Sequence, residues 1–278
     1  MIVCCVHGGG LGHLTRIRAA LHTLGWDEPV TLLSDSPFAA DERVVGDLPV
    51  VRPPHGLDRS GLTRWTAETL AALAPRDLVI DAFPAGLRGE LTAAAIPAGT
   101  RVVHLARLLR WENYRPVLPA DPPRFDLTFV LEPLAPEHHA HLEAVSREIA
   151  PLGLTDPPAR PGGDLPSPTG WLIVHSGPDE EILELVAYAQ ETAAMEGLRP
   201  DLTLVSPRRP DALPAGVEHL DVYPAWPLAG RATRIITAAG FNVVRQFAPW
   251  RDRHRLVPFP RTLDDQFTRA ARHQGPVG

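Results

Sequence analysis

The sequence opens with MIVCCVHGGGLGH, residues 1–13, in which an apolar run of six residues meets a turn with four glycines. The apolar run predicts a buried strand, and the periodic apolar residues that follow, up to residue 24, predict a helix. A helix start presents unpaired N–H groups and a partial positive charge, and this one has no acidic residue in its first turn. Residues 1–24 therefore predict the strand, turn and helix of an α/β fold, with a turn that can hold an anion.

A second turn of this kind lies near the other end of the chain. Residues 237–242, TAAGFN, close another apolar strand and lead into a helix without an acidic residue in its first turn. A competing turn, HSGP at residues 175–178, leads into a helix that begins Asp-Glu-Glu, which repels an anion. We therefore expect a diphosphate at Gly240 and expect the HSGP turn to be structural or peripheral. Three arginines near Gly240 in sequence are expected to help: Arg231, Arg234 and Arg245.

Short apolar runs alternate with helical patterns along the whole chain. Runs in which the odd and the even positions are both apolar are typical of parallel strands covered on two faces. The expected strands span residues 30–34, 78–81, 101–106, 127–131, 171–175, 202–206, 219–223, 234–237 and 255–258. Residues 151–169 hold six prolines and three glycines, which predicts a linker. We therefore expect two Rossmann-like α/β domains, residues 1–150 and 170–278, with parallel sheets that face each other across a cleft.

The composition excludes several classes of function. All 27 basic residues are arginine, so a Walker phosphate loop and a pyridoxal-phosphate Schiff base are excluded. The net charge is −6 and no basic run stands out, which argues against nucleic acid as a partner. Cys4 and Cys5 are expected to be buried thiols on opposite faces of a strand. Without a long apolar span, the protein is expected in the cytoplasm, and a peripheral membrane contact is left open.

The sequence gives no strong signal for a metal site. It has no D-x-D motif. Residues 137–141, EHHAH, lie on one short predicted helix and do not surround an ion, so they are expected to form a solvated helical face. We expect neither a metal nor a cofactor.

A dinucleotide-binding site is one alternative for the first turn. A G-x-G-x-x-G motif that begins at Gly8 and Gly10 would need a third glycine where His13 stands. Asp35, however, ends the second predicted strand, where an NAD-binding fold places its ribose acid. One element of the motif is missing and another is present, so an NAD-dependent oxidoreductase stays an alternative.

Three stretches of the sequence are similar to a known family. They are GLGHLTR at residues 10–16, LVIDAFP at 78–84 with the nearby Gly86 and GEL at 89–91, and AGFNVVRQ at 239–246 with VPFP at 257–260 and DDQ at 264–266. These stretches resemble GT-B nucleotide-sugar glycosyltransferases, and the nearest likeness is to the bacterial N-acetylglucosaminyltransferase of peptidoglycan synthesis and its relatives. The resemblance implies a GT-B fold and a donor such as a UDP- or dTDP-sugar, with an acceptor that the sequence does not identify.

The resemblance also implies which residues bind the donor. In the C-terminal domain, Gly240 and Asn242 would contact the diphosphate, Gln246 the ribose, and Asp265 with Gln266 the sugar. Gln246 departs from the family, where a glutamate is usual, and an amide offers one acceptor oxygen where a carboxylate offers two. A different interpretation of Asp264 and Asp265 is that they stabilise the start of a helix capped by Thr262. We also expect three residues of the first glycine turn and its helix to contact the donor: Gly10, Gly12 and Arg16. Nucleotide-sugar hydrolases of this fold carry a similar Gly-x-Gly-His-x-x-Arg run.

Catalysis of sugar transfer needs a base beside the acceptor hydroxyl, and histidine suits that role near neutral pH. His13 is the first candidate, because a helix start lowers its pKa and keeps it neutral. His7 is the second. Asp81 ends a strand at the same expected sheet edge and either orients a histidine, binds the acceptor or caps a helix. The alternatives to a glycosyltransferase are a hydrolase in which His13 activates water, the NAD enzyme, and a non-catalytic binder of sugar nucleotides.

Overall fold

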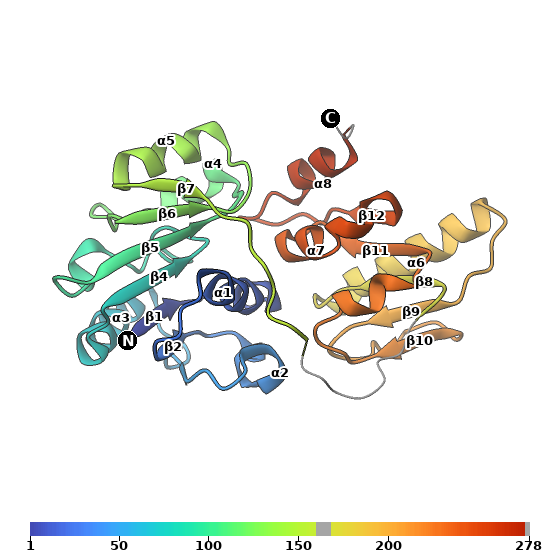
Figure 1. The fold of residues 1–278 in the computed structure, drawn as a ribbon, viewed down its shortest axis with the longest axis horizontal. Helices are drawn as coiled ribbons and strands as arrows, with labels where there is room; N and C mark the ends of the chain where they lie inside the picture. Colours follow the sequence, from blue (N-terminus) through green and yellow to red (C-terminus); the bar gives the residue numbers. More distant parts are fainter. Residues whose placement is uncertain (160–167, 276–278) are drawn as a thin grey trace. The chain divides into compact units, whose positions relative to one another are not determined.

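The computed structural model describes residues 1–159 and 168–275, which form two compact α/β units (Figure 1). The first unit comprises Met1–Pro157 together with Thr262–Asp264, and the second comprises Pro158–Arg261 and Asp265–Gly278. Part of the predicted linker, residues 160–167, lies outside the described residues. Within the described ranges, no helix is both long and apolar enough to cross a membrane.

The first unit has one parallel sheet with the strand order β3-β2-β1-β4-β5-β6-β7. Its strands are β1 (Ile2–Cys5), β2 (Val30–Leu33), β3 (Val50–Val51), β4 (Asp77–Asp81), β5 (Arg101–Ala106), β6 (Leu127–Val130) and β7 (Ile149–Pro151). Its helices are α1 (Leu11–Leu24), α2 (Glu42–Val45), α3 (Arg59–Leu73), α4 (Trp111–Tyr114) and α5 (Pro136–Val145). The strand order changes direction between β1 and β4, so the topological switch point of this sheet lies there.

The second unit repeats this arrangement with five parallel strands in the order β10-β9-β8-β11-β12. Its strands are β8 (Trp171–Val174), β9 (Leu202–Val205), β10 (Val217–Leu220), β11 (Arg234–Ala238) and β12 (His254–Val257). Its helices are α6 (Asp179–Met195), α7 (Phe241–Gln246) and α8 (Gln266–Gln274). The switch point of this sheet lies between β8 and β11. Two parallel α/β sheets were predicted, and this prediction is confirmed.

The apolar runs of the sequence form the central strands. Every residue of β1, β2, β4, β8 and β9 is buried, as expected for strands covered on both faces. Cys4 and Cys5 are buried free thiols, and burial raises the pKa of Cys5 to about 12. The sequence missed β3 and β7, which have two and three residues and include no fully buried one. β10 begins two residues earlier than predicted.

One prediction about α5 is wrong. Residues 137–141 were expected to form a solvated face, but His138 is completely buried and its ring stacks on Trp111 at a centroid distance of 4.5 Å. His104 on β5 is also completely buried and stacks on Phe125. Neither ring nitrogen of His138 has a hydrogen-bond partner among the described residues. Burial lowers the pKa of His138 to about 3 and that of His104 to about 4.

These two histidines predict a loss of stability in mild acid. Their pKa in the folded chain lies below the ordinary value of 6.5, so below pH 6.5 the unfolded chain binds more protons and stability falls. Each histidine contributes a loss of about 1.4 kcal/mol per pH unit in that range. We expect the free energy of unfolding of the wild type, relative to that of His138→Phe, to fall by about 1.4 kcal/mol between pH 7.5 and 5.5.

Urea unfolding at the two pH values measures this difference. The control is His22→Gln, which changes an exposed histidine. A pH dependence in His138→Phe equal to that of the wild type contradicts the prediction.

Candidate active site

Two of the predicted site residues meet at the carboxyl edge of the first sheet. β1 and β4 are neighbours in register, with Cys5 aligned to Ile80, and Asp81 ends β4. His13 lies in the first turn of α1, the helix that follows β1. Its Nδ1 atom is 2.7 Å from Oδ2 of Asp81. Ligands of open parallel sheets bind outside the carboxyl ends of the strands at the switch point, which is where this pair lies.

The Asp81 carboxylate is completely buried and is also bound by Arg16 of α1. Arg16 donates from Nε to Oδ1 at 2.5 Å and from Nη2 to Oδ2 at 2.6 Å. A buried carboxylate needs such partners, because leaving one charge of a buried pair uncompensated costs about 3–5 kcal/mol. Asp81 therefore engages two of the three guanidinium nitrogens of Arg16, a residue that the sequence analysis assigned to the donor.

The electrostatics of the cluster fix the charge of both partners. Burial raises the pKa of Asp81, but Arg16 and His13 outweigh burial and hold the pKa of this carboxyl well below its ordinary value. Burial lowers the pKa of His13, and Arg16 and Arg107 add to this effect against the opposing influence of Asp81. His13 is therefore neutral and Asp81 ionised near neutral pH. With Nδ1–H donated to Asp81, Nε2 keeps its lone pair, which is the arrangement of a general base.

The glycine turn is shaped around the His13 ring. Gly8 has φ +144°, and a β-carbon added there would come within 2.7 Å of Nε2 of His13. Gly9 and Gly10 are exposed and do not have positive φ. A β-carbon added to Gly9 would have no atom within 4 Å, and one added to Gly10 would have only the Gly12 nitrogen, at 4.0 Å. Backbone geometry and packing therefore require glycine at position 8, whereas the space beside Gly9 and Gly10 is open to a ligand.

The turn after β4 supports the ring from another side. Ala82 has φ +62°, a region that costs a residue with a side chain about 1–3 kcal/mol. The Phe83 N–H donates to the Asp81 carbonyl at 2.7 Å, which closes a tight turn directly after Asp81. The ring centroid of Phe83 lies 5.7 Å from that of His13.

Arg107 belongs to this site, although the sequence analysis did not single it out. It directly follows β5, the strand next to β4, and its guanidinium carbon lies 5.6 Å from the Phe83 ring centroid. It forms an ion pair with Asp264 in the segment Thr262–Asp264, which returns to the first unit. Leu263 of that segment packs in the same apolar cluster as Phe83. The sequence did offer a signal for Arg107, because this residue directly follows a predicted strand. Asp81 was identified by its place at the end of a predicted strand.

His7 and Asp35 lie next to the glycine turn. His7 is buried, and its Nδ1 atom is 3.8 Å from Oδ1 of Asp35. The same oxygen accepts a hydrogen bond from the Gly8 N–H at 3.0 Å. The acid on which the NAD alternative depends therefore anchors the turn that holds His13.

The predicted donor residues of the second unit follow β11 and β12. Gly240 precedes α7 and has open space where a side chain would stand, with Val243 at 3.7 Å as the nearest neighbour. Asn242 is buried in the first turn of α7, and Gln246 lies one turn later. The helix has only six residues. The turn at Gly240 is therefore open, and the field of its short helix is weak.

Asp265 and Gln266 already have structural partners. Asp265 caps α8 by accepting a hydrogen bond from the Thr268 N–H at 3.0 Å. The capping interpretation named Thr262 as the cap, which is wrong. The Gln266 side-chain oxygen accepts from the Phe259 N–H at 3.0 Å. Any contact with a sugar would use the remaining polar atoms, Oδ2 of Asp265 and the amide nitrogen of Gln266.

Two electrostatic expectations for this unit are wrong. Arg234 begins β11, whereas Gly240 follows the other end of that strand. Arg234 forms an ion pair with Glu196, and its guanidinium carbon lies 4.1 Å from the Trp171 ring centroid. Arg231 precedes the same end of β11. Neither arginine is therefore placed to help bind an anion at Gly240.

The turn at residues 175–178 is not peripheral. Val174 of β8 is aligned to Thr237 of β11, so the chain leaves both strands at adjacent positions of one sheet edge. The acidic start of α6 is also largely neutralised, because Asp179 pairs with Arg208 and Glu181 pairs with Arg261. Both glycine-containing turns of this unit therefore lie at its switch point.

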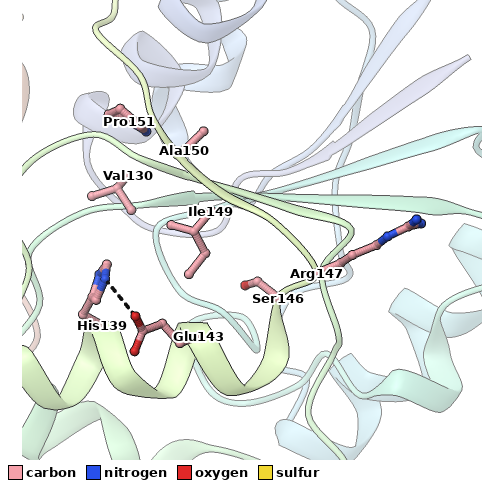
Figure 2. Close-up of a pocket in the computed structure, with 8 residues that line it drawn as sticks. All are labelled: Val130, His139, Glu143, Ser146, Arg147, Ile149, Ala150 and Pro151. Atoms are coloured by element: carbon pink, nitrogen blue, oxygen red, sulfur yellow. Dashed lines mark ion pairs between the residues drawn. The ribbon is translucent and has the colours of Figure 1, made fainter.

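A pocket of about 560 Å³ lies elsewhere on the first unit, between α5 and the edge strand β7 (Figure 2). The ion pair of His139 and Glu143, 3.5 Å apart, lies on its α5 side. β7 is the third strand from β4 in the sheet order, so this pocket is separate from the His13–Asp81 pair. This pocket therefore does not mark the His13–Asp81 site.

Comparison with known proteins identifies the fold. No protein-family profile matches the chain, and no curated protein sequence matches it. Among solved structures, the spinosyn forosaminyltransferase SpnP matches with a TM-score of 0.62 at 14% identity, over 97% of this chain and 82% of its own. The chain has a GT-B fold. The predicted resemblance to GT-B glycosyltransferases is thus confirmed at the level of the fold, and identities this low establish nothing finer.

Two further matches of this GT-B chain differ in what their names describe. The spinosyn rhamnosyltransferase SpnG, complexed with thymidine diphosphate, matches with a TM-score of 0.54 at 14% identity, over 98% of this chain and 84% of its own. A UDP-N-acetylglucosamine 2-epimerase from Rickettsia bellii matches with a TM-score of 0.54 at 11% identity, over 90% and 76%. Transferases and an epimerase thus share this fold.

The charges around His13 predict opposite effects of two substitutions. Arg107→Gln removes a cation that lowers the pKa of His13, so this pKa rises. Asp81→Asn removes the group that raises it, so this pKa falls. Nuclear magnetic resonance titration of the imidazole signals measures both. The control Arg18→Gln changes an arginine of α1 that donates to two backbone carbonyls, and it leaves the pKa unchanged. A lower pKa in Arg107→Gln contradicts this account.

Proposed function

We propose that this chain is a metal-independent glycosyltransferase that transfers a sugar from a nucleoside-diphosphate sugar to an acceptor hydroxyl. One observation carries the proposal: a neutral His13, fixed by a buried carboxylate at the switch point of its sheet. The GT-B fold, shared with proteins named glycosyltransferases, supports it. The lack of a D-x-D motif in the sequence favours a reaction without a metal.

In the proposed reaction, Nε2 of His13 accepts the proton of the acceptor hydroxyl. The hydroxyl oxygen forms a bond to the anomeric carbon, and the bond from that carbon to the diphosphate breaks. Asp81 stabilises the imidazolium that forms, because its carboxylate accepts the Nδ1–H at 2.7 Å. Arg16 keeps Asp81 ionised and the ring in place. General-base catalysis of this kind contributes about 10²–10⁴-fold to the rate.

The donor is proposed to bind at the second unit. Gly240 and Asn242 contact the diphosphate, Gln246 the ribose, and Asp265 with Gln266 the sugar, while the open glycines of the first turn offer N–H groups. The space at Gly240 supports this assignment, and so does the thymidine diphosphate in the complex of SpnG. The probes of choice are therefore UDP- and dTDP-sugars.

A reaction of the donor alone is the second candidate, because a protein named UDP-N-acetylglucosamine 2-epimerase shares the fold. In the hydrolytic form, Nε2 of His13 activates water in place of an acceptor hydroxyl. Analysis of the products formed from UDP- and dTDP-sugars without acceptor separates the candidates. Free sugar indicates a hydrolase, an epimerised nucleotide sugar indicates an epimerase, and an unchanged donor that reacts only with acceptor indicates a transferase.

His13→Gln tests the base. The variant lacks a group that accepts a proton near neutral pH, so kcat falls by about 10²–10⁴-fold. Donor binding by calorimetry is expected to change little, because most of the proposed donor contacts belong to the second unit. The control His22→Gln changes an exposed histidine of the same helix and keeps full activity. Full turnover in His13→Gln contradicts the assignment, and no binding of either nucleotide sugar at millimolar concentration contradicts the proposed function.

Gln246→Glu tests the ribose contact. A carboxylate accepts hydrogen bonds from both ribose hydroxyls, and charge-assisted bonds are stronger, so affinity for the donor rises about fivefold, or about 1 kcal/mol. Calorimetry with UDP measures the change, because its ribose carries both hydroxyls, whereas the deoxyribose of dTDP lacks one. Gln190→Glu, an exposed residue of α6, is the control for added charge. Equal or weaker binding in Gln246→Glu contradicts a ribose contact at this position.

A further inference from the structure

The second unit contains a histidine–carboxylate–arginine cluster that the proposed reaction leaves unused. His175 directly follows β8, and its Nε2 atom is 2.8 Å from Oε2 of Glu181 in the first turn of α6. Arg261 donates to both oxygens of Glu181 at 2.5 Å. The exposed fractions of these side chains are 10%, 17% and 32%, so the cluster is largely enclosed but reaches the surface.

The cluster has the same components as the site around His13. The Phe259 ring lies against His175 at a centroid distance of 5.6 Å, and a β-carbon added to Gly177 would overlap the His175 ring. A carboxylate paired with arginine holds one ring nitrogen in both units. The nitrogen differs, because Nε2 of His175 contacts the carboxylate, whereas Nδ1 does so in His13.

The position of His175 brings it close to the proposed diphosphate. Val174 and Thr237 are aligned on adjacent strands, and adjacent strands lie about 4.8 Å apart. The turn that carries His175 and the Gly240 turn therefore follow adjacent strands at the same edge of the sheet.

Charge determines the state of the histidine before a ligand binds. Burial lowers the pKa of His175, and Arg261 adds to this effect while Glu181 opposes it. Burial raises the pKa of Glu181, but Arg261 and His175 outweigh burial and lower it. Glu181 and Arg261 are the charged groups that face the ring, and Asp179 of the same helix is paired with Arg208. The histidine is therefore neutral and its carboxylate partner ionised.

We propose that His175 is a proton-linked contact for the diphosphate. Nδ1 binds a proton when a nucleoside diphosphate occupies the Gly240 turn, and Glu181 holds the resulting imidazolium through Nε2–H. The proton comes from solvent: an N–H bond forms at Nδ1, and hydronium or a buffer acid loses the proton. In sugar transfer the imidazolium donates a hydrogen bond to the leaving diphosphate and so stabilises the charge that develops there. This inference rests on the proposed function, which places the donor at the second unit.

Calorimetry of UDP and dTDP binding in buffers of different ionisation enthalpy tests the inference. We expect the wild type to take up close to one proton per nucleotide at pH 7.5, with weaker binding as the pH rises. His175→Gln keeps a side chain that can bond to Glu181, loses the uptake and binds UDP roughly tenfold more weakly at pH 6.5. His13→Gln keeps the uptake, which separates the two histidines.

The imidazole signal of His175 in the wild-type protein gives a second measurement that needs no variant. Addition of UDP at pH 7.5 shifts it to the protonated form. Binding of UDP or dTDP without proton uptake overturns the inference and leaves the proposed function standing. Uptake that persists in His175→Gln, or that disappears in His13→Gln, also overturns it. If neither nucleotide binds, the proposed function fails and the inference fails with it.

Discussion

The charge of Asp81, enclosed at the end of a central strand, constrains everything around it in the first unit. An ionised carboxylate without water needs donors on its oxygens, and α1 supplies them from Arg16 and His13. This requirement fixes the rotation of α1, because both donors lie on one face of the helix, three residues apart. The glycine turn then passes close to the His13 ring, which only Gly8 permits. The residues that position α1 are thus the same residues that the proposed reaction uses.

Much of this fold follows from local sequence patterns. Runs of apolar residues at both parities define the central strands, because a strand covered on two faces has no polar side to show. The pairing of His13 with Asp81 was also predictable in outline, since residues after the carboxyl ends of adjacent parallel strands meet at one edge. The resemblance of the glycine turns to GT-B glycosyltransferases predicted a GT-B fold, and the matching solved structures support this fold.

The remainder depends on contacts between distant residues, which no local pattern encodes. The charges of Glu181 and Asp179 repel an anion only if they are unpaired, and their partners Arg261 and Arg208 lie far away in sequence. His138 looked solvated because its neighbours in sequence are polar, yet the Trp111 ring covers it. Arg234 lies close to Gly240 in sequence, but a strand of five residues separates them in space. Short edge strands such as β3 carry too few residues for a pattern.

The return of Thr262–Asp264 to the first unit has a consequence for dividing the chain. The Arg107–Asp264 pair and the Leu263 contact belong to the first unit, but Leu263 and Asp264 follow the strands of the second unit in sequence. The apolar cluster around Phe83 is therefore incomplete in a fragment that stops at Pro157. A cut between the two units would change the surroundings of His13 without removing any residue of the first sheet.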